Sequence, residues 1–422
     1  MRDDDGAAGI ARHDGRALPI PAFAAAGIEL EYMIVDRDTL DVRPIAERLL
    51  ASFAGHETAD VARGPMGWSN ELVRHVVEVK NREPAATLAP LIPRFQDEIR
   101  AADALLAEYD ARLMPTAMHP WMNPARETML WDGEIYRTYD RIYGCRAHGW
   151  ANLQSMHVNL PFAGDGEFAR LHAAIRLILP LLPALAASSP IAEGQSTGLL
   201  DFRLDAYRDN CRITPSVAGR VVPETVETEA EYDAKVLRPM YDEIAHHDGD
   251  GVLAHEWLNS RGAIARFDRS AIEIRVIDAQ ECPHVDLAIA AATRAVVHTL
   301  YDERYAPLDE QQAVATEALE AVLLATMRDA DEAVIDDPEY LHALGMQGQR
   351  CVARDVWMPL LQDASNGHAW WQPALEVIVR EGPLARRILR ATGMSPDHAR
   401  LRAVYRALCR CLHEGRMFRA EA

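Results

Sequence analysis

Two glutamates, Glu29 and Glu31, interrupt the apolar segment GIELEYMIVD at residues 27–36. Side chains of a strand alternate between its faces, so both carboxylates are expected on one face, with Ile28 and Leu30 on the other. A strand rises about 3.3 Å per residue, which sets the two carboxylates about 7 Å apart. Their repulsion raises at least one pKa unless cations lie between them. The segment therefore suits a strand that faces cations.

Glu71 and Glu78 lie seven residues apart in the segment NELVRHVVEVKN, residues 70–81. Seven is an odd number of steps, so the two carboxylates cannot share a face of one regular strand. Either a bulge interrupts the strand, or Glu71 belongs to the loop that precedes it. One of these irregularities is required if both carboxylates reach the same site.

Two more segments alternate polar and apolar side chains. LQSMHVNLPF places His157 and Asn159 on one face of a strand, and AIEIRVID places Glu273 and Arg275 on one face of another. Taken alone, each residue has an ordinary structural explanation: a solvated strand glutamate, a hydrogen-bonded core histidine, or a cross-strand Glu–Arg pair. Together the four segments supply five carboxylates and one imidazole. Such a ligand set suits Mg²⁺ or Mn²⁺ better than zinc.

The order of these motifs resembles the glutamate–cysteine ligase family, especially its second bacterial type, the ATP-dependent carboxylate–amine ligases. The motifs are ExE, two acids seven apart, HxN and ExR, and the resemblance runs from about residue 25 to 300. More distantly, the chain is similar to glutamine synthetase. The resemblance implies an α+β fold in which a curved, mainly antiparallel sheet forms a funnel flanked by helices. Supporting segments are MHPW (118–121), SSPIAEGQSTGLLDFR (188–203) and EIRVIDAQECP (273–283).

The resemblance also implies a reaction, in which ATP converts a carboxylate to an acyl phosphate that an amine then attacks. Metal ions and an arginine neutralise phosphate charge in such reactions, and Arg275, beside Glu273, is expected to steady the transferred phosphoryl group. The acid at position 71 is often aspartate in relatives, and Arg74 stands where relatives can carry another acid. The expected ligands are Glu31, Glu71 and Glu78 for one Mg²⁺, and Glu29, His157 and Glu273 for a second.

Arginines are the expected contacts to substrate or nucleotide, because they form two-pronged hydrogen bonds with carboxylate and phosphate. Relatives keep an arginine at the position of Arg203, which is expected to bind substrate or nucleotide together with Arg212 and Asn159. For Arg212, a surface ion pair is the alternative. Glutamate is the donor that the resemblance implies, and cysteine is one candidate acceptor amine.

Three further residues carry weaker expectations. Arg350 and Arg354, in the helical part of the chain, are lesser candidates for a phosphate contact. His119, in MHPW, is expected only to order a loop.

Composition narrows the class of protein. The chain of 422 residues is 49% apolar and 26% charged, as globular proteins are. Its net charge of −20 argues against a nucleic-acid partner and is compatible with a cavity that collects divalent cations. The sequence shows no apolar run near the roughly 18 residues of a membrane span, and its first residues do not resemble a signal peptide. A cytoplasmic protein with small-molecule partners is expected, and a homo-oligomer is compatible with the sequence.

Hydrophobic patterns predict the elements. Residues 1–20 are expected to be a mobile tail, and residues 21–422 a single catalytic domain that is mainly helical from about residue 285. Strands are expected at 27–36, 72–80, 112–118, 153–160 and 270–278, helices at 89–110, 166–188 and 227–247, and a loop at 188–198.

The sequence thus predicts an ADP-forming carboxylate–amine ligase that uses ATP and Mg²⁺ or Mn²⁺ to form a γ-glutamyl amide. One alternative is an ATP-dependent phosphotransferase of the guanidino-kinase kind on the same fold. The other is a non-catalytic nucleotide-binding regulatory protein. The acid and histidine set argues against the second, because buried charges are unfavourable unless something requires them.

Overall fold

The computed structural model describes residues 19–365 and 369–420. The expected tail at residues 1–20 therefore lies outside the described residues, apart from Pro19 and Ile20. The remaining chain is α+β, as predicted, and is built around an eight-stranded sheet with the order β2-β3-β4-β1-β6-β10-β9, in which β5 also pairs with β1. All its pairings are antiparallel. The strands are β1 (Gly27–Asp36), β2 (Asp60–Arg63), β3 (Met66–Asn70), β4 (Val76–Asn81), β5 (Ala111–Met114), β6 (Ser155–Pro161), β9 (Ala263–Arg266) and β10 (Ala271–Asp278).

One face of the sheet is apolar and helix-covered. Ile28, Leu30 and Tyr32 of β1 are fully buried and join one core cluster with side chains such as Val79 and Val158 of the neighbouring strands. Alternation along each strand produces this face, because every second residue points to it. The helices that pack here are α2 (Leu91–Leu106), α6 (Gly164–Ile178) and α12 (Pro283–Tyr301).

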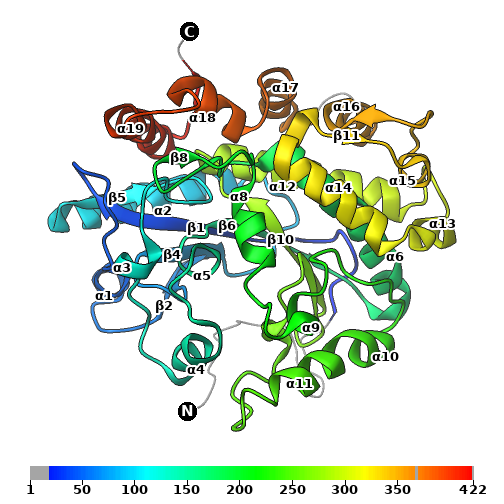
Figure 1. Cartoon of the computed structure of the whole chain (residues 1–422), viewed down its shortest axis with the longest axis horizontal. Helices are drawn as coiled ribbons and strands as arrows, with labels where there is room; N and C mark the ends of the chain where they lie inside the picture. Colours follow the sequence, from blue (N-terminus) through cyan, green and yellow to red (C-terminus); the bar gives the residue numbers. More distant parts are fainter. Residues whose placement is uncertain (1–18, 366–368, 421–422) are drawn as a thin grey trace.

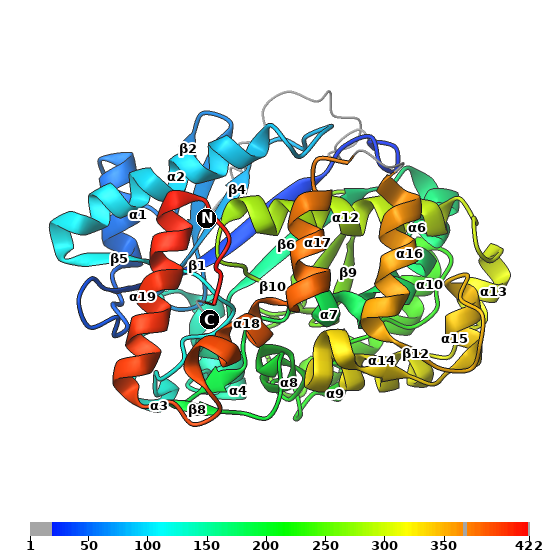
Figure 2. The ribbon, with the colours of Figure 1, turned by 90° about the horizontal axis from the view of Figure 1, so that it is seen from above.

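The C-terminal helices form a further layer outside α2 and α12 (Figure 2). Figure 1 shows β1 along its length, with these helices on one side of it and the shorter helices α4, α9 and α11 on the other. Short helices therefore lie on the side of β1 that faces away from the C-terminal helices (Figure 1). The helices added here are α4 (Glu134–Tyr143), α9 (Pro215–Ala218), α11 (Arg238–Ile244), α16 (Ala353–Ser365), α17 (Gln372–Glu381), α18 (Leu384–Thr392) and α19 (His398–Glu414).

Local sequence explains where the long helices begin and end. α12 begins at Pro283, whose ring fixes a helical φ and whose missing N–H is not needed in the first turn. The Asp397 carboxylate accepts a hydrogen bond from the Arg400 backbone N–H and so caps α19. Gly415 ends α19 at a φ of 72°, a left-handed conformation that glycine adopts without strain.

Several expected boundaries were wrong. The strand expected at 72–80 begins only at residue 76, because residues 71–75 form a loop and turn. Two short strands before it, β2 and β3, were not predicted. The expected loop at 188–198 contains a two-stranded hairpin, and DFR at its end begins the helix α8 (Phe202–Arg208). The helix expected at 227–247 is three consecutive helical pieces, the middle one a π-helix.

The expectation that the chain has no long apolar run was also wrong. In the described residues one helical segment, Gly164–Ala186, is long and apolar enough to cross a membrane by length and composition. However, 94% of its apolar window is buried inside the protein. The segment thus has the burial of a core helix, and it packs against α12.

Candidate functional site

The strand register gathers the predicted acids on one face of the sheet. Glu29 of β1 lies opposite His157 of β6, and Glu31 of β1 lies opposite Glu78 of β4. Residues directly opposite in an antiparallel pair point to the same face, so these side chains meet. Glu273 of β10 joins them through the pairing of β10 with β6. We call this set the acid face: Glu29, Glu31, Glu71, Glu78, His157 and Glu273.

Glu71 reaches the acid face from outside the strands. It lies in the loop between β3 and β4, which is the second of the two arrangements that the sequence required. One carboxylate oxygen from each of Glu31, Glu71 and Glu78 lies within 4.8 Å of the others. Burial and the nearby Glu31 and Glu78 carboxylates raise the pKa of Glu71 well above its ordinary value. The loop thus places a third carboxylate beside those of Glu31 and Glu78, which repel it.

His157 is the centre of the acid face. Its Nδ1 lies 3.2 Å from a Glu29 oxygen and 3.4 Å from a Glu273 oxygen, and its Nε2 lies 3.8 Å from Glu31. Burial disfavours the imidazolium, but the hydrogen bond to Glu29 and the charges of Glu273 and Glu31 outweigh it and raise the pKa of His157 to about 9. His157 is therefore a cation at neutral pH when nothing else occupies the site.

Lys80 neutralises the opposite end of the acid face. Its Nζ donates to Glu78 at 2.8 Å and to the Ser69 hydroxyl at 3.1 Å, and that hydroxyl donates to Glu78 at 2.8 Å. Burial and the charge of Glu29 nevertheless raise the pKa of Glu78 to about 7. Internal cations therefore compensate the acid face only in part.

The donor atoms fall into two groups of metal-binding size. Glu31, Glu71 and Glu78 form one group, which is the set expected for the first cation. The second group contains Glu29, His157 and Glu78, where the sequence suggested Glu273 in place of Glu78. Glu78 can serve both groups because it lies in the strand directly beside β1. These oxygen-rich groups with one imidazole are of the kind that holds Mg²⁺ or Mn²⁺.

Arg275 points to the acid face together with Glu273. Its Nε lies 3.1 Å from a Glu273 oxygen, and its NH1 donates to the Asn259 carbonyl at 3.2 Å. Burial opposes its charge, but Tyr207, Glu273 and Glu31 hold the pKa of Arg275 above its ordinary value. Arg266 of β9 lies 3.7 Å from the other Glu273 oxygen. Two guanidinium groups thus flank one carboxylate beside the metal-binding groups.

Arg203 is buried behind Arg275. Its Nε donates to the Asp278 carboxylate at 2.5 Å, and its NH2 donates to the Arg275 carbonyl at 3.3 Å. The Ser188 backbone N–H and the Ser189 hydroxyl also donate to Asp278. These contacts give Arg203 a positioning role at the end of β10, and direct binding of substrate or nucleotide remains a prediction for it.

The other predicted binding residues have different surroundings. The Asn159 amide donates to Glu29 at 3.1 Å, so it belongs to the polar network of the acid face. The Arg212 side chain is 76% exposed and lies 3.4 Å from Asp209, which matches the surface ion pair considered as its alternative. Arg354 pairs with Asp331 at 4.0 Å, and Arg350 is exposed.

His119 orders a loop, as expected. Its Nε2 donates to the Leu40 carbonyl at 2.8 Å, and its Nδ1 accepts from the Met122 backbone N–H at 3.0 Å. Both ring nitrogens are therefore used by the backbone, and burial lowers the pKa of His119 to about 4.

Sequence reasoning missed three polar residues of the acid face. The Ser155 backbone N–H and hydroxyl both donate to Glu31, at 2.6 and 2.9 Å, and its hydroxyl also contacts His157. Lys80 and Ser69 were not assigned to the site. Ser155 precedes His157 by two residues and Lys80 follows Glu78 by two, so alternation along each strand would have placed both on the acid face.

Comparison with known proteins identifies the family. The sequence pattern that defines Glutamate-cysteine ligase family 2 (GCS2) matches residues 25–407, beyond the range of the resemblance noted in the sequence. The matched range includes all six residues of the acid face. The chain belongs to glutamate–cysteine ligase family 2.

Two curated relatives illustrate the match. An uncharacterized protein of Archaeoglobus fulgidus is 35% identical over 280 residues, which cover 66% of this chain and 75% of that protein. A protein of Rubrobacter xylanophilus named "Putative glutamate--cysteine ligase 2-3" is 31% identical over 182 residues, covering 43% of this chain and 47% of that protein. The second match therefore spans about half the length of the relative.

Solved structures share the fold at low sequence identity. A glutamate–cysteine ligase of Francisella tularensis, in complex with AMP, matches with a TM-score of 0.59 and 11% identity, over 92% of this chain and 88% of that chain. A bifunctional glutathione synthetase of Pasteurella multocida matches with a TM-score of 0.56 and 12% identity, over 92% of this chain and 53% of that chain. At these identities the likeness concerns the fold alone.

Proposed function

We propose that the chain is an ATP-dependent carboxylate–amine ligase that forms ADP and a γ-glutamyl amide through an acyl phosphate. The observation that carries this proposal is the register of β1, β4, β6 and β10, which gathers four carboxylates, His157 and Arg275 on one polar face, to which the loop before β4 adds the Glu71 carboxylate. Family membership supports the same reaction class. Phosphoryl transfer depends on positioning and charge neutralisation, which such a face can supply.

Divalent cations fit the acid face on the evidence of its own charges. Burial and like charges raise the pKa values of Glu71 and Glu78, so these carboxylates lack sufficient cationic partners within the protein. Two Mg²⁺ or Mn²⁺ ions would be held by the two metal-binding groups, with Glu273 beside them. When bound, the ions would neutralise phosphate oxygens of ATP. A cation beside Glu273 would weaken the ion pair between Glu273 and Arg275. The Arg275 guanidinium could then contact the transferring phosphoryl group.

The substrates follow from the family. Glutamate is the proposed donor carboxylate, and cysteine is one candidate acceptor, as the names of relatives suggest. The AMP held by the Francisella tularensis protein supports a nucleotide on this fold. In this proposal the protein acts on small molecules in the cytoplasm.

The test is a product assay with the full chain, ATP, MgCl₂, glutamate and a panel of amines that includes cysteine. ADP, phosphate and an amide in equal amounts are the expected products, and the ADP should depend on both glutamate and the amine. Mass spectrometry identifies the amide. The Arg275→Ala variant is the matched control, because it should retain the fold and lose turnover.

Three other outcomes of this assay would contradict the proposed reaction. AMP and pyrophosphate would rule out the acyl-phosphate route. A phosphorylated guanidino compound with no amide would indicate the phosphotransferase alternative. Nucleotide binding with no product for any amine would indicate the regulatory alternative.

A further inference from the structure

A second charged region lies between α2, β5 and α19, and it shares no lining residue with the acid face. It is a cavity of about 320 Å³, near the lower end of the size of small-molecule sites. Its lining contains four arginines and two acids in a protein whose net charge is −20. We call it the arginine cavity; its charged lining residues are Arg37, Arg100, Arg112, Arg410, Asp103, His413 and Glu414.

Backbone carbonyls hold two of these arginines in place. Arg37 donates from NH2 to the Ala111 carbonyl at 3.2 Å and to the Asp103 carbonyl at 3.5 Å. Arg100 donates from Nε to the His413 carbonyl at 3.3 Å, and its only carboxylate contact among the described residues is the exposed Asp97 at 3.7 Å. A carbonyl orients a guanidinium without cancelling its charge. The positive charges of Arg37 and Arg100 are therefore largely unneutralised by neighbouring carboxylates.

The acids of the arginine cavity are engaged elsewhere. The buried Asp103 carboxylate accepts from the Leu113 backbone N–H at 2.9 Å and lies 3.1 Å from the His413 Nδ1. Glu414 pairs with Arg416, which lies outside the lining. The acids thus leave the guanidinium groups of the cavity without a full set of counter-charges.

Arg112 and Arg410 have no carboxylate partner in the part of the chain that the structure describes. Arg112 is half-buried on β5, and its Nε is buried with no hydrogen-bond partner. A buried donor without a partner is unfavourable, so such donors in folded proteins call for an explanation. Arg410 projects from α19 into the same lining. Both groups are available to an anion.

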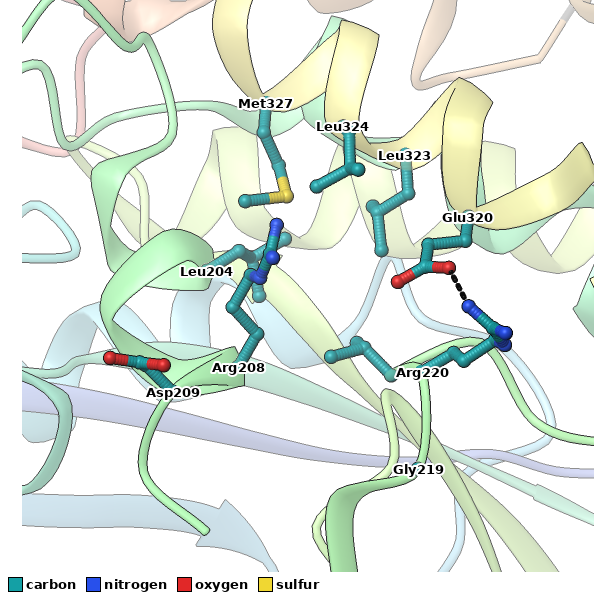
Figure 3. Close-up of a pocket in the computed structure, with 10 residues that line it drawn as sticks. Leu204, Arg208, Asp209, Gly219, Arg220, Glu320, Leu323, Leu324 and Met327 are labelled. Carbon is teal, nitrogen blue, oxygen red and sulfur yellow. Dashed lines mark hydrogen bonds and ion pairs between the residues drawn. The ribbon is translucent and has the colours of Figure 1, made fainter. Parts of the chain in front are cut away.

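A second cavity in the described residues differs from the arginine cavity in size and in its charged lining. It measures about 140 Å³ and lies between α8 and α14 (Thr316–Asp329) (Figure 3). There Arg220 faces Glu320, with which it forms an ion pair, and apolar side chains of α14 form one wall. The Arg220 charge is thus paired within the protein, and the volume of this cavity is less than half that of the arginine cavity.

We propose that the arginine cavity binds a small multivalent anion whose charge is carried by phosphate or carboxylate groups. Guanidinium forks pair with both groups through two parallel hydrogen bonds, and lysine offers no such geometry. Among the described residues, neither group that could hold a metal ion includes a lining residue of the arginine cavity, and we expect the anion to bind without a divalent cation. This distinguishes it from ATP at the acid face.

The test is calorimetric titration of the full chain with pyrophosphate and, separately, with citrate. Metal is removed beforehand with a chelating resin, since a soluble chelator is itself a multivalent anion. Arg112→Gln and Arg410→Gln should each weaken binding at least tenfold, and Arg410→Gln changes only an exposed side chain. Arg94→Gln is the matched control, because Arg94 is an exposed arginine on α2 outside the cavity and its loss should change binding less than twofold.

The two anions distinguish the sources. Tighter pyrophosphate identifies a phosphate-bearing ligand, and tighter citrate identifies a polycarboxylate. Binding that is equally weak for both anions in the parent overturns the proposal. Binding that Arg94→Gln reduces as much as Arg410→Gln also overturns it, because the effect would then come from overall charge.

Discussion

The acid face and the arginine cavity carry opposite charges, and the protein compensates them in different ways. On the acid face, cations of the protein contact the carboxylates directly, as Lys80 contacts Glu78 and His157 contacts Glu29. In the arginine cavity, Arg37 and Arg100 are held mainly by neutral carbonyls, and Arg112 has an unpaired Nε. The first region is built around internal ion pairs, and the second keeps its charge for an external partner.

This difference has a consequence for how each region binds ligands. Cations that enter the acid face must displace or rearrange internal partners such as Lys80 and His157. An anion that enters the arginine cavity meets guanidinium groups that form no ion pair with the carboxylates of the lining. Binding at the acid face should therefore depend on particular residues, and binding at the arginine cavity should fall steeply with ionic strength. The following variants test these two modes of compensation.

The largest expected effect is on the buried ion pair behind the acid face. Arg203→Ala should lower the free energy of unfolding by about 3–5 kcal/mol, because it leaves the Asp278 carboxylate buried without its partner. Urea denaturation measures the change. Arg212→Ala, which removes an exposed pair, should stay close to the parent. If Arg203→Ala instead keeps its stability and raises KM for a substrate, Arg203 binds that substrate directly.

Arg275 should have the next largest effect, on turnover. Arg275→Ala is expected to lower kcat on the order of 10²–10³-fold with a modest change in KM for ATP, because the guanidinium acts on charge that develops in the transition state. Arg275→Lys should recover little, since a point charge does not reproduce the fork. Steady-state kinetics of ADP formation measures both. Turnover near the parent rate in Arg275→Ala would show that the residue is structural.

The buried histidines outside the acid face should control stability in acid. Burial lowers the pKa of His75 to about 4, below the 6.5 of an unfolded histidine, so the unfolded chain binds more protons between these values. Stability is then complete above pH 6.5 and falls as the pH drops toward 4, by about 1.4 kcal/mol per pH unit for each such histidine.

Denaturation at pH 6.5 and pH 5 measures this slope. His75→Gln should reduce it, and His342→Gln, which changes a side chain that is 73% exposed, should not. An unchanged slope in His75→Gln would show that other groups cause the acid sensitivity. His75 and His157 have the same side chain, but their pKa values shift in opposite directions. Burial lowers the pKa of His75, and neighbouring carboxylates raise the pKa of His157.

The smallest expected effect is on metal binding, and it tests whether the acid face and the arginine cavity bind their ligands independently. Glu78→Gln should weaken Mn²⁺ binding at least tenfold, on the order of the loss that even an outer partner of a metal ligand produces. Electron paramagnetic resonance measures free Mn²⁺ directly. Glu317→Gln, an exposed glutamate, is the control and should bind Mn²⁺ as the parent does. Metal-free binding of pyrophosphate should be the same in Glu78→Gln and the parent, and a change there would show that the two regions are coupled.

Much of the acid face could be predicted from local sequence. Alternation alone puts Glu29 with Glu31, His157 with Asn159, and Glu273 with Arg275, because the period of a strand is two whatever its neighbours are. The odd spacing of Glu71 and Glu78 correctly required an irregularity. The α+β class and most of the longer elements followed from hydrophobic patterns. Short strands such as β2 and β9 did not, since four residues hold too little pattern to separate a strand from a turn.

Only the tertiary structure decided which residues meet. The register of β1 against β4 places Glu78 opposite Glu31, and so makes Glu78 a member of both metal-binding groups. Pairing between strands depends on contacts far apart in the chain, which no local pattern contains. Arg203 illustrates the same limit, because its sequence suits ligand binding and its burial against Asp278 shows a positioning role.

The arginine cavity is the clearest case of what the sequence left open. Its four arginines come from the turn after β1, from α2, from β5 and from α19, more than 370 positions apart at the extremes (residues 37 and 410). Each one alone has the sequence surroundings of an ordinary surface arginine. The sequence by itself determined the faces of the strands, because side-chain alternation is a local property. The packing of α19 against α2 and β5 decided where the uncompensated positive charge collects, because that contact joins segments far apart in the chain.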